Sequence, residues 1–279
     1  MNKAQTILSL KDAGLKHASI KKTSLKRSSA EAHINTLGPF SIDIKSNERI
    51  AMLGPSGAGK STLLQIMSGL HEHDGCIEFL SKPIKQMSVQ ELSYKRAFLA
   101  QHHETSFNLS SELIISLGRV ARDHDPELVK IIKESAKAAQ AEHLLERSYQ
   151  TLSGGERARV HLARVFAQLW DQQNGILLID EPMTALDPGL QIELLSSILT
   201  YCQDRSHALV AILHDIQQAI EHFERLILIK NGKIIADLPS HPAPHQELEC
   251  LYSMRLEKLT RPGRKDLLIP SDPGCSQAI

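Results

Sequence analysis

Three short apolar runs divide the chain, and each leads directly into residues that can carry chemistry. The runs are Ile50–Leu53, Ile176–Ile179 and Leu209–Leu213. Runs of this length without polar interruption predict strands buried on both faces, as in a parallel sheet. The first ends in a glycine-rich turn, the second in two acids and the third in a histidine. Function in such sheets gathers at the carboxyl ends of the strands, so the three endings predict one site.

The segments between and after these runs carry helix and turn signals. Asp187 and Pro188 suit an N-cap and a first helical residue, and an apolar stripe follows them. Residues 87–151 are charged, alanine-rich and poor in β-branched stretches, which predicts a smaller helical subdomain inserted into the sheet domain. Residues 226–238 predict a hairpin with an Asn-Gly turn, and residues 239–279 are interpreted as a tail without strong periodicity.

Composition narrows the range of partners. The 279 residues carry a formal net charge of +0, which gives no reason to expect nucleic acid as a partner. No apolar run approaches the ~20 residues that cross a bilayer, and the N-terminus lacks the apolar segment of a signal peptide. These features predict a cytoplasmic protein whose membrane contact goes through partners.

The glycine-rich turn matches the phosphate-binding pattern G-x-x-x-x-G-K-[ST], which requires a preceding strand and a following helix. Glycines allow successive backbone N–H groups to turn inward and hold phosphates, helped by the helix N-terminus. Lys60 is expected to reach the β- and γ-phosphates of a nucleotide, and Ser61 to ligate Mg²⁺. The residues of this P-loop, with the threonine that follows, are Gly54, Pro55, Ser56, Gly57, Ala58, Gly59, Lys60, Ser61 and Thr62.

The two acids after the second run predict metal binding and catalysis. Asp180 closes the run and Glu181 follows it. A carboxylate at this place can hold Mg²⁺ directly or through water, while the next one polarises the attacking water. Adjacent residues at a strand end point in different directions, so Asp180 is predicted to bind the metal and Glu181 to be catalytic.

The residues Leu152–Glu156, called the signature segment below, combine a helix start with a possible anion site. Ser153 and Glu156 form a capping box. Gly154 and Gly155 leave the helix N-terminus bare, so N–H groups and a hydroxyl are exposed to an anion. One interpretation is a helix start and no more. The other is a second phosphate site, which only a dimer whose subunits cover each other's ATP requires.

Together, the P-loop, the signature segment, Ile176–Glu181 and His214 resemble the ATPase family of ABC transporters, from about residue 35 to 238. The resemblance implies an α/β P-loop NTPase fold with a mainly parallel core sheet, an antiparallel β region and an inserted helical subdomain. It also implies that Gln101 contacts Mg²⁺ and water, that His214 contacts the γ-phosphate, and that Asp187 ends a D-loop at the nucleotide.

This resemblance divides the chain into four parts. Residues 1–86 are predicted to form the N-terminal part of the nucleotide-binding core with the P-loop. Residues 87–151 would form the helical subdomain with Gln101, and residues 152–238 the C-terminal part of the core. Residues 239–279 would remain as the tail.

Two departures from the family pattern carry expectations of their own. The family usually stacks an aromatic residue on adenine, but residues 1–39 contain no Phe, Tyr or Trp. A weak adenine contact, or one supplied by His17 or His33, is therefore expected. Asn47 stands where glycine is common before the first strand, and because asparagine tolerates a left-handed conformation the replacement is expected to be harmless.

Within the family, the similar members are those that import vitamin B12, haem and ferric siderophores. Leu37–Pro39, Arg96–Gln101 and Glu181–Met183 resemble the vitamin B12 importer, whereas Leu117–Arg119 and Arg159–Trp170 are closer to haem and siderophore members. The first set includes core and permease-facing segments. Import of the corrinoid vitamin B12 is therefore the first hypothesis, and haem or ferric siderophore import is the alternative.

The expected protein is the ATP-hydrolysing subunit of a bacterial ABC importer that uses ATP and Mg²⁺. Its expected partners are a second copy of the chain, two transmembrane permease subunits and, indirectly, a substrate-binding protein, but no nucleic acid. Its expected place is the cytoplasmic face of the inner membrane, as a peripheral subunit. The signature segment disfavours a P-loop kinase or GTPase, and the lack of long coiled coils or a second cassette disfavours a DNA-repair or translation ATPase.

Overall fold

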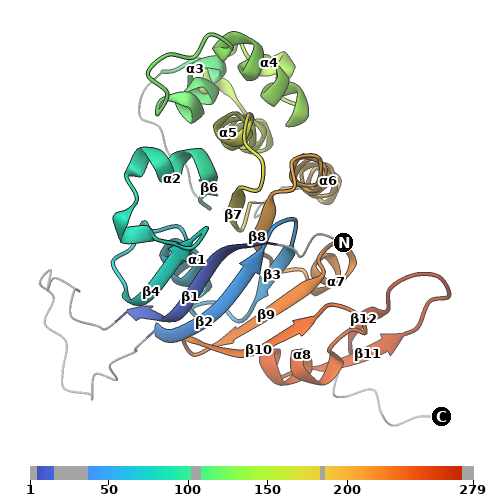
Figure 1. The fold of residues 1–279 in the computed structure, drawn as a ribbon. Coiled ribbons are helices and arrows are strands. Elements are labelled where there is room, and N and C mark those ends of the chain that lie inside the picture. The colour runs from blue at the N-terminus through green and yellow to red at the C-terminus, as the bar shows by residue number, and fades with distance from the viewer. Residues whose placement is uncertain (1–4, 16–36, 102–107, 183–185, 272–279) are drawn as a thin grey trace, which may run out of the picture.

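The computed structural model describes residues 5–15, 37–101, 108–182 and 186–271. Figure 1 shows a layer of strands in the middle of the molecule, with helices above it and a small helix-and-hairpin unit at the C-terminal end. The described strands are β1 (Thr6–Leu15), β2 (Leu37–Lys45), β3 (Arg49–Leu53), β4 (Asp74–Phe79), β5 (Lys82–Pro83), β6 (Arg96–Leu99), β7 (Ile176–Asp180), β8 (Ala208–Ile212), β9 (Arg225–Lys230), β10 (Lys233–Pro239), β11 (Arg255–Leu259) and β12 (Leu267–Ser271).

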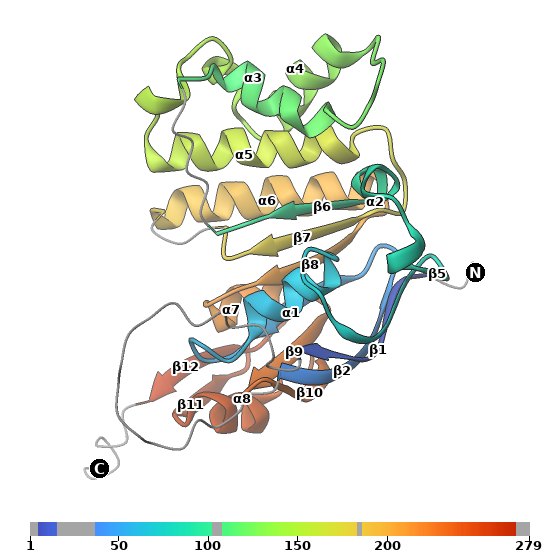
Figure 2. The same cartoon turned by 90° about the vertical axis from the view of Figure 1, so that its left-hand side faces the viewer.

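The described helices are distributed over both faces of the central sheet (Figure 2). The α-helices are α1 (Lys60–Met67), α2 (Val89–Lys95), α3 (Ser111–Ser116), α4 (Leu128–Ala138), α5 (Gly154–Leu169), α6 (Pro188–Asp204), α7 (Ile216–His222) and α8 (His245–Tyr252). Four short 3-10 helices join them: η1 (Ile84–Gln86), η2 (Leu117–Arg119), η3 (Glu142–Leu144) and η4 (Tyr149–Thr151).

The central sheet has six strands in the order β10-β9-β3-β8-β7-β6. The neighbours from β9 to β6 are all parallel, and only the β9–β10 hairpin is antiparallel. Met52 pairs with Ile212, and Ile212 with Asp180, so these three residues form one row across the sheet. Whatever follows β3, β7 and β8 therefore emerges at the same edge.

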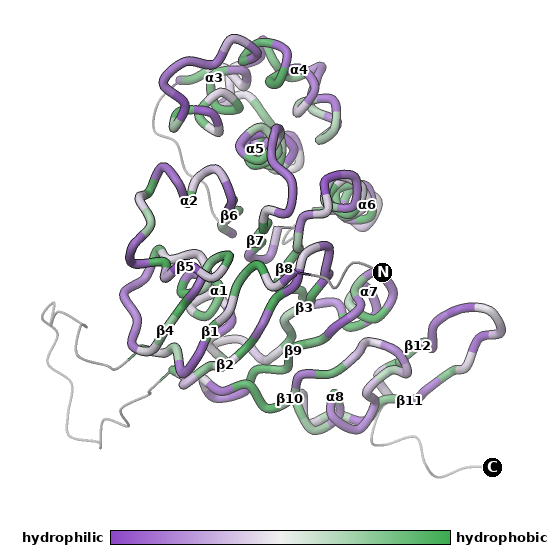
Figure 3. Tube along the Cα trace, in the orientation of Figure 1, coloured by the Kyte–Doolittle hydropathy of each residue, from purple (hydrophilic) through white to green (hydrophobic). Residues whose placement is uncertain are grey.

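Both faces of this sheet are buried, as the unbroken apolar runs predict. Along β3, Ile50 and Met52 pack into a core with α1 and the antiparallel sheet β2-β1-β4-β5. Ala51 and Leu53 pack into the opposite core, with α5, α6 and α7. In Figure 3 the central strands are accordingly mainly in the hydrophobic colour. The predicted fold class is confirmed: a mainly parallel core sheet, an antiparallel β region and a helical part.

The predicted helical subdomain, residues 87–151, contains one strand of the central sheet. Within residues 87–151, Arg96–Leu99 forms β6, the edge strand of the central sheet, paired in parallel with β7. A run of four residues after a charged helix is too short for its composition to stand out, so the sequence pattern does not reveal β6. Helices α3 and α4 pack on α5, so the helical layer also includes the helix that begins at the signature segment.

The C-terminal tail is more ordered than its lack of periodicity suggested. Residues 245–252 form α8, and β11 pairs with β12 in an antiparallel hairpin. Leu248 and Leu251 are buried in the core on the α5–α7 face of the sheet. One apolar turn and two short strands are too brief for a periodic signal, so packing against the core shapes this segment.

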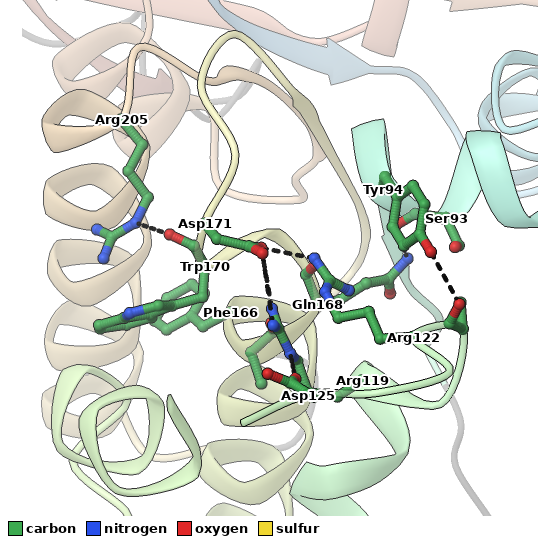
Figure 4. A network of polar contacts seen from close by, with 12 residues as sticks. Ser93, Tyr94, Arg119, Arg122, Asp125, Phe166, Gln168, Trp170, Asp171 and Arg205 are labelled. Atoms are coloured by element: carbon green, nitrogen blue, oxygen red, sulfur yellow. Dashed lines mark hydrogen bonds and ion pairs between the residues drawn. The ribbon is translucent and has the colours of Figure 1, made fainter. Parts of the chain in front are cut away.

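Four charged residues, the arginine clamp, tie η2 and the loop after it to the end of α5 (Figure 4). Arg119, whose side chain is only 3% exposed, contacts Asp125 at 2.6 Å and Asp171 at 2.9 Å. Arg122 contacts the same Asp171 at 2.5 Å. Burial alone would raise the pKa of Asp171, but the hydrogen bonds from Arg119 and Arg122 hold that pKa below its usual range. The clamp members are Arg119, Arg122, Asp125 and Asp171.

Removing the buried member of the clamp should be costly. Arg119→Ala leaves Asp125 and Asp171 without their shared cation, and breaking a buried pair costs about 3 kcal/mol in the free energy of unfolding. The matched control is Lys130→Ala, which removes an exposed pair with Glu127 and should cost at most about 0.5 kcal/mol. Urea denaturation measures both. An equal, small loss for the two variants would mean that the clamp does not hold the helical layer.

Candidate functional site

A pocket of about 510 Å³ lies at the edge of the sheet where β3, β6, β7 and β8 end. Residues from all four strand ends line it, together with one residue from β2. The lining residues are Leu37, Ser56, Gly57, Ala58, Gly59, Lys60, Ser61, Thr62, Gln101, Glu181 and His214. The three endings that the apolar runs predicted to meet therefore do meet.

The P-loop backbone has the curvature that its glycines permit. Gly57 and Gly59 have φ angles of 76° and 99°, in the left-handed region that favours glycine. Gly54 is required for a different reason, because a Cβ there would lie 2.2 Å from the carbonyl oxygen of Ile229 on β9. Gly59 is the N-cap of α1 and has no side chain to cap the helix, so the first N–H groups of α1, whose residues Lys60–Thr62 line the pocket, have no side-chain cap.

Lys60 is folded back onto the loop that it follows. Its side chain is buried at 4% exposure, and Nζ donates to the carbonyl oxygens of Gly54 at 2.8 Å and Pro55 at 3.1 Å. Burial lowers the pKa of Lys60, while the nearby carboxylates of Glu181 and Asp180 act in the opposite direction. A buried ammonium held by carbonyl oxygens beside two acids is available to an anion that enters the pocket.

The hydroxyl and the carboxylate predicted to hold a metal are in contact. Ser61 Oγ donates to Asp180 Oδ1 at 3.0 Å, from the first turn of α1 to the end of β7. Asp180 is 4% exposed. These are hard oxygen donors of the kind that Mg²⁺ takes from proteins, usually one or two per site.

Glu181 is held by two side chains from neighbouring strand ends. Its Oε2 accepts a hydrogen bond from Gln101 Nε2 at 2.7 Å, and His214 Nε2 lies 2.7 Å from its Oε1. The Glu181 side chain is 12% exposed, whereas that of His214 is 53% exposed. The backbone of Glu181 has a φ of 46°, a conformation that few residues other than glycine adopt, and such strain is concentrated at functional sites.

The signature segment starts α5 as the capping box predicts. Ser153 Oγ accepts from the Glu156 N–H at 3.3 Å, and Glu156 accepts from the Ser153 N–H at 2.7 Å. That backbone hydrogen bond is the main reason why the pKa of Glu156 is below its usual range. Ser153 and Gly154 are exposed, and neither lines the pocket of their own chain. A Cβ on Gly155 would lie 2.3 Å from Leu190 Cδ2, so this glycine allows α5 and α6 to approach closely.

Asp187 also has the local role that its sequence predicts. It caps α6 by accepting from the Leu190 N–H at 3.0 Å, and Pro188 takes the first helical position. It does not line the pocket. Residues 183–185, which include most of the proposed D-loop, lie outside the described residues.

The sequence analysis did not predict Leu37 as a lining residue, but its expectation for Asn47 is confirmed. Leu37, at the start of β2, lies over Gly59, where a Cβ would be 2.5 Å from Leu37 Cδ2. This side chain is aliphatic, whereas the family pattern places an aromatic residue on adenine. His17 and His33 lie outside the described residues. Asn47 has a φ of 59°, so it adopts the left-handed conformation expected of it.

Comparison with known proteins decides the family. A family model described as ABC transporter matches residues 37–184, which is more than half of the chain. This chain belongs to the ABC transporter family. Its site is that of an ABC ATPase, which couples ATP hydrolysis to transport, and the described residues contain no helix long and apolar enough to span a membrane.

Two curated relatives share more than a third of their residues with this ABC ATPase. A hemin import ATP-binding protein of Pseudomonas fluorescens (strain Pf0-1) is 36% identical over 240 residues, which cover 84% of this chain and 92% of the relative. Its namesake in Pseudomonas aeruginosa (strain PAO1) is 38% identical over 232 residues, covering 82% of this chain and 91% of the relative. Vitamin B12, the first sequence hypothesis, gains no support from these relatives, and the haem alternative is better supported.

Solved structures confirm the fold of the ABC ATPase. One described as a metal-chelate type ABC transporter in an inward-facing conformation has a TM-score of 0.77 at 20% identity, covering 96% of this chain and 99% of the other. A dimeric bacterial ABC transporter cassette has a TM-score of 0.71 at 23% identity, covering 84% of this chain and 99% of the other.

Glu181→Gln should separate binding from hydrolysis. The amide preserves the shape of the side chain but cannot polarise water, so steady-state ATP hydrolysis should fall about 10²-fold or more while ATP still binds. The matched control is Glu134→Gln, an exposed change on α4 that should leave hydrolysis at the parental rate. Phosphate release and equilibrium nucleotide binding measure the two properties. Hydrolysis at the parental rate in Glu181→Gln would rule out the catalytic assignment.

Proposed function

We propose that this chain is the ATP-hydrolysing subunit of a bacterial importer for hemin. The observation that carries the catalytic part is the contact of Glu181 with both Gln101 and His214 inside the pocket that the P-loop lines. Two side chains from neighbouring strand ends thus hold one carboxylate at the pocket, and a positioned carboxylate can act as a general base toward water.

The residues of the pocket would take different roles in binding and hydrolysing ATP. The backbone of residues 54–59 would surround the phosphates, and the Lys60 ammonium would leave its carbonyl partners for phosphate oxygens. His214, being half exposed beside Glu181, would contact the terminal phosphate. Glu181 would hold the attacking water in line and accept its proton.

Magnesium fits the residues that face it. Ser61 and Asp180 would hold the ion, since their oxygen atoms already touch, and the amide oxygen of Gln101 is suited to the same cation. When bound, the ion neutralises charge that develops on the phosphates. The buried Asp180 carboxylate keeps Ser61 oriented toward that position.

A second copy of the chain would complete the site. Ser153 and Gly154 of the signature segment are exposed and lie outside their own chain's pocket, and the start of a helix favours an anion. The Ser153 hydroxyl accepts a hydrogen bond from Glu156 and still has a proton to donate. Each subunit would therefore present Ser153 and Gly154 to ATP held by the P-loop of the other. Two permease subunits, reached near Gln101, would receive the resulting motion and would place the dimer at the cytoplasmic face of the membrane.

Leu37 would supply the contact with the base. It lies over Gly59 and lines the pocket, so an apolar surface is available to a purine ring. An aliphatic side chain contacts any purine face and reads no hydrogen-bonding edge. Weak discrimination between ATP and GTP is the consequence.

The choice of hemin rests on the relatives. Proteins named for hemin import are 34–39% identical to this chain over most of their length in several Pseudomonas species, Vibrio parahaemolyticus and Rhodopseudomonas palustris. The cargo would be recognised by the permease and a substrate-binding protein, and this chain would never touch it.

Leu37→Ala tests the base contact. Loss of the apolar side chain removes about 1 kcal/mol of contact with the ring, so the KM for ATP should rise about fivefold. The KM for GTP should rise by the same factor, because no hydrogen bond to the base is lost. Steady-state hydrolysis with each nucleotide measures both. A KM for ATP that rises more than tenfold further than that for GTP would show that Leu37 helps to read adenine.

Growth on hemin tests the cargo. A strain that lacks this gene should fail to grow with hemin as its iron source, because no other chain would drive the permease. The parental chain and Lys130→Ala should restore growth, whereas Lys60→Ala should not, since it removes the phosphate-binding ammonium. The same strain should still use external vitamin B12.

The opposite pattern would overturn the assignment. Unimpaired growth of the deletion strain on hemin, together with lost vitamin B12-dependent growth, would return the first sequence hypothesis. Growth restored by Lys60→Ala would contradict the role of the P-loop instead.

A further inference from the structure

The C-terminal segment reaches the P-loop through one tyrosine. Tyr252 is the last residue of α8, and its Oη accepts a hydrogen bond from the N–H of Gly54 at 3.2 Å. Gly54 is buried and is the first residue of the P-loop. The two residues are 198 positions apart in the sequence, so only the folded tail brings this acceptor to the loop.

Gly54 is held on three sides. The carbonyl oxygen of Ile229 on β9 is so close that a Cβ would lie 2.2 Å from it, and Tyr252 binds the Gly54 N–H. The Gly54 carbonyl accepts from Lys60 Nζ at 2.8 Å. A single residue, Gly54, thus connects the Tyr252 hydroxyl to the resting position of Lys60.

The tail can impose this position because it is anchored elsewhere. Lys230 at the end of β9 donates through Nζ to the carbonyl oxygen of Cys250 at 2.8 Å, which fixes α8 beside β9 (Figure 2). At its other end, Lys265 donates to the carbonyl oxygens of Ile220 and Phe223, at the C-terminus of α7. A lysine at a helix C-terminus satisfies carbonyl groups that have no partner in the helix.

Packing against the core positions the partly buried side chain of Tyr252. Its ring packs against the core on the α5–α7 face of the sheet, and burial raises the pKa of the hydroxyl, so Oη stays neutral near pH 7. Tyr252 does not line the pocket. It therefore acts on a nucleotide only through Gly54.

We propose that Tyr252 is a positioning residue for the P-loop, through which the C-terminal segment sets the affinity for ATP. This rests on the proposed phosphate-binding role of residues 54–61. An acceptor for a buried N–H fixes the first turn of the loop, and a loop that is fixed before ATP arrives loses less conformational freedom on binding. The hydroxyl of Tyr252 bonds to Gly54, whereas Gln101 and His214 contact Glu181. Tyr252 therefore sets the affinity for ATP and leaves the rate of the chemical step unchanged.

Tyr252→Phe tests the proposal because it removes one oxygen atom and leaves the packed ring. The KM for ATP should rise roughly five- to tenfold, with kcat within about twofold of the parental value. Hydrogen exchange of the peptide that contains residues 54–61, followed by mass spectrometry without nucleotide, should become faster. A general loss of stability would not raise the KM for ATP without changing kcat, and it would not speed hydrogen exchange in residues 54–61 alone.

The matched control is Tyr201→Phe. The Tyr201 hydroxyl likewise bonds to a backbone group, donating to the carbonyl oxygen of Phe166 at 2.7 Å, but this contact is buried between α5 and α6. Tyr201→Phe should lower the melting temperature about as much as Tyr252→Phe does. It should leave the KM for ATP and the hydrogen exchange of the P-loop unchanged. Equal effects of the two variants on KM and exchange would overturn the proposal.

Lys60→Ala distinguishes the positioning role of Tyr252 from the phosphate-binding role of the P-loop. If Lys60→Ala loses ATP binding while Tyr252→Phe has the parental KM and exchange rate, the positioning role is wrong and the P-loop assignment stands. If Lys60→Ala binds ATP as tightly as the parent, the phosphate-binding role itself is wrong.

Discussion

Parallel pairing of β3, β8, β7 and β6 is the constraint on which the site depends. Parallel strands end at the same edge, and the row formed by Met52, Ile212 and Asp180 sets how far each extends. The P-loop, His214 and Glu181 leave the sheet within two residues of that row, and Gln101 follows β6. A slip of one residue in any pair would turn a catalytic side chain to the opposite face of the sheet.

The rest of the molecule maintains that edge. The antiparallel sheet and α1 bury one face, while α5, α6 and α7 bury the other, so the strands cannot move separately. The arginine clamp joins η2 and the loop after it to the end of α5. Near the same end of α5, Gln168 donates to the carbonyl oxygens of Ser93 and Arg96. The signature segment, with Ser153 and Gly154 exposed, is thus held at a fixed place relative to β6 and to Gln101 beyond it.

How much the sequence predicts depends on the length of each signal. The three apolar runs and the P-loop pattern are local, so their strands, their common edge and the lining residues of the P-loop follow from them, whereas Gln101 was expected only from the family resemblance. The capping box of Ser153 and the left-handed Asn47 are also local and are confirmed. The metal and dimer roles of Ser61, Gln101, Asp180 and Asp187 stay predictions.

Features that depend on tertiary packing were not predictable. Strand β6 has four residues, α8 has one buried face, and neither shows a period. The contact of Tyr252 with Gly54 joins residues that no pattern relates, and Leu37 escapes notice because it is aliphatic. The preference for vitamin B12 came from short matching segments, whereas relatives aligned over most of the chain favour hemin.

The central claim is that one copy's P-loop and another copy's signature segment form each working site. Mixing two inactive variants, Lys60→Ala and Ser153→Arg, tests it most directly. Head-to-tail pairing gives mixed dimers one site with both defects and one site with neither. The account predicts ATP hydrolysis well above the sum of the two variants measured alone. A mixture no more active than that sum would contradict it, because a site built within one chain stays defective in either variant.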